Sequence, residues 1–295
     1  MMAAPTPIEL ATVRAWADPP TPAEVARRLA SADETLTVAA TADELAGLIA
    51  CIDLTTLEGS DTPARVAALT EHARIPDPDD PDLAPVAAVC VYPSLVPAAV
   101  AAASGSPVRV ASVAGAFPSG QSPLPVRLAD IAAAAEAGAD EIDIVLNRGA
   151  FLAGDLETAY SDVVASVAAA EGRLVKVILE TGELGDLPSV AVATLLVLAA
   201  GADFVKTSTG KIPVSATPEA VITMSRSVAR FEAETGRSVG IKVSGGLRTV
   251  DDARRYAALV SGQFGPERLV PAGFRLGASR LLDALVDARR SVPLT

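Results

Sequence analysis

The feature that most constrains the fold of this chain is an alternation of predicted strands and helices, which runs from residue 51 almost to the end. Short apolar runs alternate there with alanine-rich stretches of helical period. The predicted strands lie near 51–54, 86–91, 108–114, 140–146, 174–180, 203–207, 239–243 and 273–276. The predicted helices lie at 62–74, 93–104, 122–137, 155–171, 187–199, 217–235, 249–261 and 278–290. Eight strand–helix units of about thirty residues are the expected rhythm of a (β/α)8 barrel.

A doubly wound open sheet is the structural alternative to this barrel. Its commonest signature is a G-x-G-x-x-G turn after the first strand, and no such turn follows residues 51–54. Half of the residues are hydrophobic but only 3% are aromatic, so aliphatic side chains must fill the core. That composition suits helices packed on a parallel sheet. We therefore expect an α/β fold, a (β/α)8 TIM barrel, over residues 51–295.

Residues 1–50 do not follow the alternation. They are rich in proline and contain helix-like stretches at about 22–32 and 41–50. We expect them to form an N-terminal helical extension that packs on the barrel, and a regulatory role is the alternative interpretation.

Composition excludes several classes of function. A net charge of −12 argues against a nucleic-acid partner, although local cations and backbone N–H groups can still hold a single phosphate. Cys51 and Cys90 lack metal-site spacing and indicate reduced thiols, and the single histidine, His72, is predicted at the surface. We therefore expect no metal and no cofactor. The first residues do not resemble a signal peptide and no apolar run approaches the roughly 20 residues of a membrane span, so we expect a cytoplasmic protein without a membrane partner.

Charged residues occupy positions that should face the barrel axis. Side chains point to alternate faces along a strand, and the apolar residues of four successive strands are predicted to face outward, toward the helices. The inner face then receives Asp143, Lys176, Lys206 and Lys242, together with Glu141, Asn147, Glu180, Ser208 and Ser244. One inward lysine could be a member of a structural ion pair, because lysine is rarely buried unless paired or functional. Three lysines and an aspartate on adjacent strands predict an active site at the C-terminal face of the barrel.

Clustered lysines are suited to carbonyl chemistry. A lysine amine attacks a carbonyl only when neutral, and its ordinary pKa lies far above 7. A second ammonium about 5 Å away disfavours the charged form by roughly 3 kcal/mol at an effective dielectric of about 20, and burial adds to this. The cluster therefore predicts Schiff-base catalysis, with Asp143 transferring protons. This reasoning does not choose among the three lysines.

Glycine-containing loops after the late predicted strands predict a phosphate site. They are Ser208-Thr209-Gly210-Lys211, Ser244-Gly245-Gly246 and Gly277-Ala278-Ser279, the last of which precedes a predicted helix. Glycines let backbone N–H groups approach a phosphate, and barrels often place one after strands seven and eight.

Eight segments also carry a resemblance to a known family. They are DLTTL (53–57), VCVYP (89–93), FPSG (117–120), GADEIDIVLNRG (138–149), LVKVILETGEL (174–184), GADFVKTSTGK (201–211), GIKVSGGLRT (240–249) and FRLGAS (274–279). In this order and spacing the chain resembles the deoxyribose-phosphate aldolase family, which are class I aldolases of barrel fold. The resemblance implies reversible cleavage of 2-deoxy-D-ribose 5-phosphate to acetaldehyde and D-glyceraldehyde 3-phosphate.

The resemblance also implies a role for each matching residue. Lys206 would form the Schiff base, Lys242 would lower its pKa, and Asp143 would move protons through water with help from Lys176. Asp53, at the end of the first strand, could pair with Lys242. The implied substrate and phosphate contacts are Thr209, Gly210, Lys211, Gly245, Gly246, Gly277 and Ser279, and Cys90 would line the aldehyde side unless it is only a small apolar filler.

Three positions depart from the family pattern. The common KPAGG is KVSGG at 242–246, and Arg280 replaces a second serine after Ser279, which either weakens a phosphate contact or adds a cation. No tyrosine follows Tyr256, whereas some relatives end in a tyrosine that reaches the site. The remaining alternatives are another Schiff-base aldolase or transaldolase and a barrel that only binds sugar phosphates. Dimers are common in the family, so a homodimer is an option.

Overall fold

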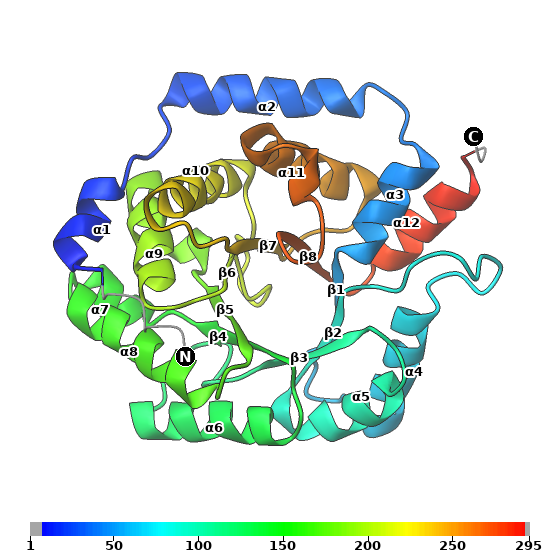
Figure 1. The fold of residues 1–295 in the computed structure, drawn as a ribbon, viewed down its shortest axis with the longest axis horizontal. Coiled ribbons are helices and arrows are strands. Elements are labelled where there is room, and N and C mark those ends of the chain that lie inside the picture. The colour runs from blue at the N-terminus through cyan, green and yellow to red at the C-terminus, as the bar shows by residue number, and fades with distance from the viewer. Residues whose placement is uncertain (1–7, 293–295) are drawn as a thin grey trace.

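The computed structural model describes residues 8–292, and its centre is a closed parallel barrel of eight strands in sequence order (Figure 1). The predicted fold class is confirmed. The strands are β1 (Ile52–Thr55), β2 (Ala88–Val91), β3 (Arg109–Val113), β4 (Glu141–Val145), β5 (Leu174–Ile178), β6 (Phe204–Lys206), β7 (Gly240–Ser244) and β8 (Phe274–Ala278).

The helices of the barrel surround these strands. They are α4 (Pro63–Arg74), α5 (Val96–Ala103), α6 (Leu124–Glu136), α7 (Arg148–Leu152), α8 (Leu156–Ala169), α9 (Leu187–Ala199), α10 (Pro218–Thr235), α11 (Val250–Phe264) and α12 (Leu281–Arg290). Short 3-10 turns are η1 (Pro93–Leu95), η2 (Thr181–Glu183) and η3 (Pro266–Arg268). Thr62 and Thr217 each accept a hydrogen bond at the start of a helix whose first residue is proline. Within residues 8–292 no helix combines the length and the apolar character needed to cross a membrane.

The core has two parts. Outward-facing strand residues such as Ile142, Val175 and Ile241 pack against the helices in one large apolar cluster. A second, small cluster lies inside the barrel on the early strands and consists of Leu57, Ala88, Cys90, Ala111 and Val113. Charged side chains occupy the interior on β1 and on β4 to β8, namely Asp53, Glu141, Asp143, Lys176, Lys206, Lys242 and Arg275. The apolar cluster on the early strands therefore shares the barrel interior with a buried ionic group.

Several predicted boundaries were wrong. The strand predicted at 140–146 ends at Val145, so Asn147 does not face the barrel axis. It caps the unpredicted helix α7 and donates a hydrogen bond to Asp162 of α8. The last helix begins at Leu281 rather than at 278, because Ala278 still pairs with Leu54 of β1.

Three helices precede the barrel: α1 (Leu10–Trp16), α2 (Pro22–Leu36) and α3 (Ala42–Ala50). Figure 1 shows α2, in blue, running across the outside of α10 and α11. Arginines attach this segment: Arg28 donates to the Leu259 carbonyl (2.6 Å), and Arg254 pairs with Glu44 (2.8 Å). The first seven residues of the predicted extension and the last three of the chain lie outside the described residues.

Candidate active site

Four neighbouring strands bring the predicted inward residues together. Asp143 of β4 pairs in register with Lys176 of β5, and Lys206 of β6 pairs with Lys242 of β7. All four side chains are buried, with Lys206 3% exposed and the others 0%. The alternation of side chains along each strand therefore predicted the inward position of these four residues correctly.

Asp143 lies at the centre of this group. Its Oδ1 accepts a hydrogen bond from Lys176 Nζ at 2.9 Å, and its Oδ2 accepts from Lys206 Nζ and Lys242 Nζ, each at 2.8 Å. One carboxylate thus serves three ammonium groups. It holds the amines of Lys206 and Lys242 against the same oxygen atom.

The lysines differ in how many other carboxylates they contact. Lys176 lies 2.6 Å from Glu141 and 3.6 Å from Asp53, and Lys242 lies 2.5 Å from Asp53. The pairing of Asp53 with Lys242 is as expected. Lys206 has Asp143 as its only carboxylate within 4 Å among the described residues. Of the three lysines, Lys206 therefore has the least negative charge nearby to compensate a protonated amine.

This difference sets the direction of each lysine's pKa. Burial lowers the pKa of Lys206, and Lys242 lowers it further, against the opposing effect of Asp143. Burial also disfavours charge on Lys176 and Lys242, but their additional carboxylates outweigh it and raise both pKa values. Asp143 is desolvated as well, yet the surrounding lysines hold its pKa well below the ordinary range. The geometry thus favours a neutral amine at Lys206 beside an ionised Asp143.

Arg275 of β8 lies beneath this group and is a residue that the sequence reasoning missed. Its guanidinium lies 2.5 Å from Asp53 and 2.8 Å from Glu141. Outward-facing Phe274 and Leu276 flank it, so the alternation rule, applied to β8, would have assigned Arg275 to the interior.

Cys90 lies inside the barrel on β2, within the small apolar cluster. Burial raises the pKa of its thiol, and the negative charge of Asp143 raises it further. Cys90 is thus a neutral, weakly polar surface facing the lysines.

A loop after β6 is fixed by Glu180, another residue to which the sequence reasoning gave no role. Glu180 has a left-handed backbone (φ +55°) and accepts hydrogen bonds from Thr209 N (3.1 Å) and Thr209 Oγ1 (2.5 Å). Thr209 Oγ1 also accepts from Lys211 N at 3.1 Å. With its proton given to Glu180, the Thr209 hydroxyl retains one lone pair that can accept a hydrogen bond.

Lys211 lies at the rim of the barrel and is exposed. Its Nζ donates to the Leu57 carbonyl at 2.7 Å and to Glu58 at 3.1 Å, both in the loop after β1. With Lys176, Lys206 and Lys242 it completes the chain's complement of four lysines. Every lysine of the protein thus lies at this one site.

The remaining predicted residues lie at the same end of the barrel, but Gly277 belongs to β8, which ends at Ala278, and not to a loop after the strand as predicted. Gly210, Gly245 and Gly246 have positive φ angles, and Ser279 is exposed before α12. Gly277 serves a different need, because a Cβ there would lie 3.0 Å from Lys242 Cε and 2.8 Å from Ser244 Cβ. Gly277 therefore leaves room for the Lys242 side chain.

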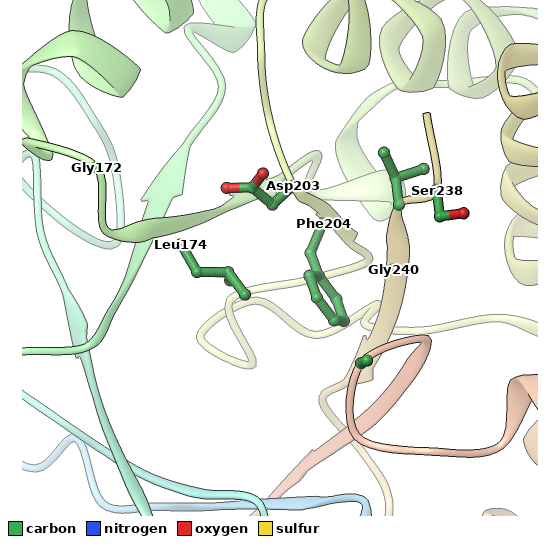
Figure 2. Close-up of a pocket in the computed structure, with 8 residues that line it drawn as sticks. Gly172, Leu174, Asp203, Phe204, Ser238 and Gly240 are labelled. Carbon is green, nitrogen blue, oxygen red and sulfur yellow. The ribbon is translucent and has the colours of Figure 1, made fainter. Parts of the chain in front are cut away.

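The other end of the barrel has a cavity of about 330 Å³ (Figure 2). Leu174, Phe204 and Gly240, which line it, are the first residues of β5, β6 and β7. No lysine lines this cavity, and one oxygen of its Asp203 accepts the Val175 N–H at 2.9 Å. In residues 8–292 no group of three or more His, Cys, Asp or Glu side chains is arranged to hold a metal ion.

The chain is similar to known aldolases in sequence and in fold. The family model described as DeoC/LacD family aldolase matches residues 48–283. The deoxyribose-phosphate aldolase of Mus musculus is 44% identical over 242 residues, which cover 78% of this chain and 76% of the mouse protein. The Homo sapiens enzyme of the same name is 43% identical over 241 residues, with the same shares. A solved tetrameric deoxyribose phosphate aldolase from Aeropyrum pernix superposes with a TM-score of 0.66 at 28% identity, covering 92% of this chain and all of that one.

Proposed function

The chain belongs to the DeoC/LacD family of aldolases, and from this premise we propose that it cleaves 2-deoxy-D-ribose 5-phosphate reversibly to acetaldehyde and D-glyceraldehyde 3-phosphate. The named relatives at 43–44% identity support this substrate. We propose that the reaction proceeds through a Schiff base on Lys206. The observation that carries this assignment is that Lys206 has a lowered pKa and a single carboxylate partner, whereas Lys176 and Lys242 have raised pKa values.

In the cleavage direction, the neutral Lys206 amine attacks the aldehyde carbon C1 of the open-chain sugar to form a carbinolamine. Loss of water gives the Schiff base, which withdraws electrons from C2. Removal of the C3 hydroxyl proton then breaks the C2–C3 bond, releases D-glyceraldehyde 3-phosphate and leaves an enamine on Lys206. Protonation at C2 and hydrolysis release acetaldehyde and restore the free amine.

Asp143 is the proposed proton carrier for these steps. Its carboxylate lies 2.8 Å from Lys206 Nζ and is held ionised, so it can accept a proton, directly or through water, as the carbinolamine forms. That proton then passes from the Asp143 carboxyl group to the departing hydroxyl, while Lys176 and Lys242 remain charged beside it. Cys90 would line the acetaldehyde side, where a neutral thiol is compatible with the methyl group.

The substrate's other end would bind at the loops after β6, β7 and β8. Thr209 would accept a hydrogen bond from a substrate hydroxyl, since its own proton is given to Glu180. Backbone N–H groups of the glycine loops and the start of α12 would receive the phosphate, with Lys211 as a cation. These residues are Gly210, Gly245, Gly246, Gly277 and Ser279. Arg280 is exposed next to Ser279 and would add a second cation.

The test of the proposed function is reductive trapping. Incubation with acetaldehyde and sodium borohydride should add one ethyl group per chain, and peptide mapping should place it on Lys206. A barrel that only binds sugar phosphates would gain no covalent mass. A transaldolase-like enzyme would instead be trapped more efficiently by dihydroxyacetone, so the two carbonyl compounds are compared side by side.

Lys211→Ala should raise the KM for 2-deoxy-D-ribose 5-phosphate about tenfold, which corresponds to about 1.4 kcal/mol. The same variant should leave kinetics with unphosphorylated 2-deoxy-D-ribose nearly unchanged, because the Lys211 amine contacts Leu57 and Glu58 and takes no part in the contacts of Asp143 with the buried amines. Steady-state kinetics with both sugars measure this ratio, and Lys211→Arg is the charge-preserving control. An equal loss with both sugars would assign Lys211 to loop structure rather than to phosphate binding.

We propose further that residues 1–50 are an extension packed on a catalytic barrel formed by residues 51–295. The family model begins at residue 48, which supports this division. We also propose a cytoplasmic location, which the two unpaired buried cysteines favour. We propose in addition that the chain forms a homo-oligomer, with the homodimer as one option.

A further inference from the structure

The buried charged side chains of the barrel form one connected network that contains more cationic groups than carboxylates. Each member contacts another within 4 Å, and each is at most 3% exposed. The network consists of three carboxylates, Asp53, Glu141 and Asp143, and four cations, Lys176, Lys206, Lys242 and Arg275. With every lysine protonated it would carry one surplus positive charge.

Surplus charge in such a place is unfavourable. Moving an ion from water into a protein interior costs several kcal/mol unless an opposite charge compensates it. The network can reach neutrality by releasing one proton from a lysine. Arg275 cannot release one, because a guanidinium stays protonated in proteins and its two carboxylates raise its pKa further.

Lys206 is the amine whose deprotonation costs the least free energy in lost ion pairs. Lys176 contacts three carboxylates and Lys242 contacts two, whereas Lys206 contacts only Asp143 and shares that oxygen atom with Lys242. The neutral form of Lys206 therefore balances the network while all other ion pairs stay intact.

We propose that Arg275 supplies the fixed positive charge that makes a neutral Lys206 the electrically balanced state of the barrel interior. This inference rests on the proposed function, in which Lys206 is the nucleophile. Arg275 contacts Asp53 and Glu141 and not the Lys206 amine, so it is a positioning residue that acts through the network.

Other charged and titratable groups around Lys206 do not change this balance. Cys90, across the barrel on β2, has a raised pKa and is neutral. Glu180, after β5, is engaged by the two donors of Thr209 and has no ion pair with the network within 4 Å. Arg109 approaches Glu141 at 3.8 Å, but its side chain is 57% exposed and is screened by water.

The charge count makes predictions of opposite sign for two substitutions. Arg275→Met leaves three carboxylates and three lysines, so the network is balanced with Lys206 protonated. Glu141→Gln removes one carboxylate and increases the surplus, so Lys206 releases its proton more readily. The double variant Arg275→Met/Glu141→Gln again has one surplus cation and should resemble the wild type.

The experiment measures the rate of acetaldehyde trapping by cyanoborohydride at Lys206 as a function of pH in the full-length protein. Arg275→Met should move the acid limb of this profile alkaline by about one pH unit, a tenfold slower reaction on that limb. Glu141→Gln should move it acid, the double variant should restore it, and Arg275→Lys should leave it in place. Circular dichroism and thermal melting establish that each variant is folded.

The outcomes separate the two proposals. No trapping at Lys206 in the wild type would refute the proposed function itself. Normal wild-type trapping with an unshifted acid limb in Arg275→Met would refute the role of Arg275 alone. A double variant whose acid limb stays at the alkaline position of Arg275→Met would also refute it, because the charge count predicts that the limb returns to the wild-type position. If Arg275→Met does not fold, Glu141→Gln still tests the sign: an acid limb that fails to move acid overturns the proposal.

Discussion

Replacing Lys206 with leucine abolishes acetaldehyde trapping and lowers turnover by a factor on the order of 10⁴ or more, while the barrel remains folded. The loss is this large because the Schiff base has no second amine positioned to replace the first, and removing a covalent nucleophile typically costs several orders of magnitude. Folding is retained because Asp143 still contacts Lys176 and Lys242, so no carboxylate is left unpaired. Steady-state kinetics, trapping with mass spectrometry and thermal melting measure the three quantities.

The matched control for this substitution is Lys211→Leu, which changes the lysine of the loop that follows β6. That variant should still be trapped by acetaldehyde, because Lys211 lies at the rim with its amine on Leu57 and Glu58. Trapping of Lys206→Leu at a different lysine, with turnover retained, would contradict the assignment of the nucleophile.

Lys242→Met should slow turnover at pH 7 about tenfold to a hundredfold and move the acid limb of the pH profile alkaline by about one to two units. Two effects have the same sign: the repulsive ammonium disappears, and Asp143 Oδ2 is left to Lys206 alone. Both raise the pKa of Lys206, so the neutral fraction at a given pH below that pKa falls. A pH–rate profile of kcat/KM, measured for the wild type and the variant, checks the shift.

Recovery at alkaline pH distinguishes this mechanism from simple misplacement of side chains. A variant whose only defect is a protonated Lys206 regains most of its rate when the pH is raised. A variant with distorted geometry stays slow at every pH. An acid limb at the wild-type position would show that Lys242 does not set the protonation of Lys206.

The fold and the central part of the site followed from sequence because both depend on simple periodicities. Parallel strands buried by helices read as short aliphatic runs, and alternation within a run assigns a side chain to one face. Asp143, Lys176 and Lys206 lie on regular strand positions. Each follows an outward-facing residue, Ile142, Val175 or Val205, by one position, so the alternation places it inside. It was enough to know which residues of each strand face outward.

What sequence did not yield lies where regular backbone ends. Asn147 follows the end of β4, and the short helix α7 turns its side chain toward Asp162 instead of the axis. Glu180 adopts a left-handed backbone conformation, which nothing about a glutamate predicts. Lys211 contacts a loop more than 150 residues away in the chain, and no local pattern reports such a contact. Arg275 was the avoidable omission, since it obeys the same alternation as the lysines.

The confinement of all four lysines to one end of the barrel has a practical consequence for handling the protein. Arginine supplies the cations elsewhere, and Lys211 is the lysine that solvent reaches, so amine-coupling supports, dyes or cross-linkers would attach through a lysine at the mouth of the barrel. In a preparation tethered through its lysines, the opening of the barrel would then face the support, and little sugar would reach the active site. Coupling through the 36 aspartates and glutamates, most of which lie outside the barrel interior, would leave the opening free.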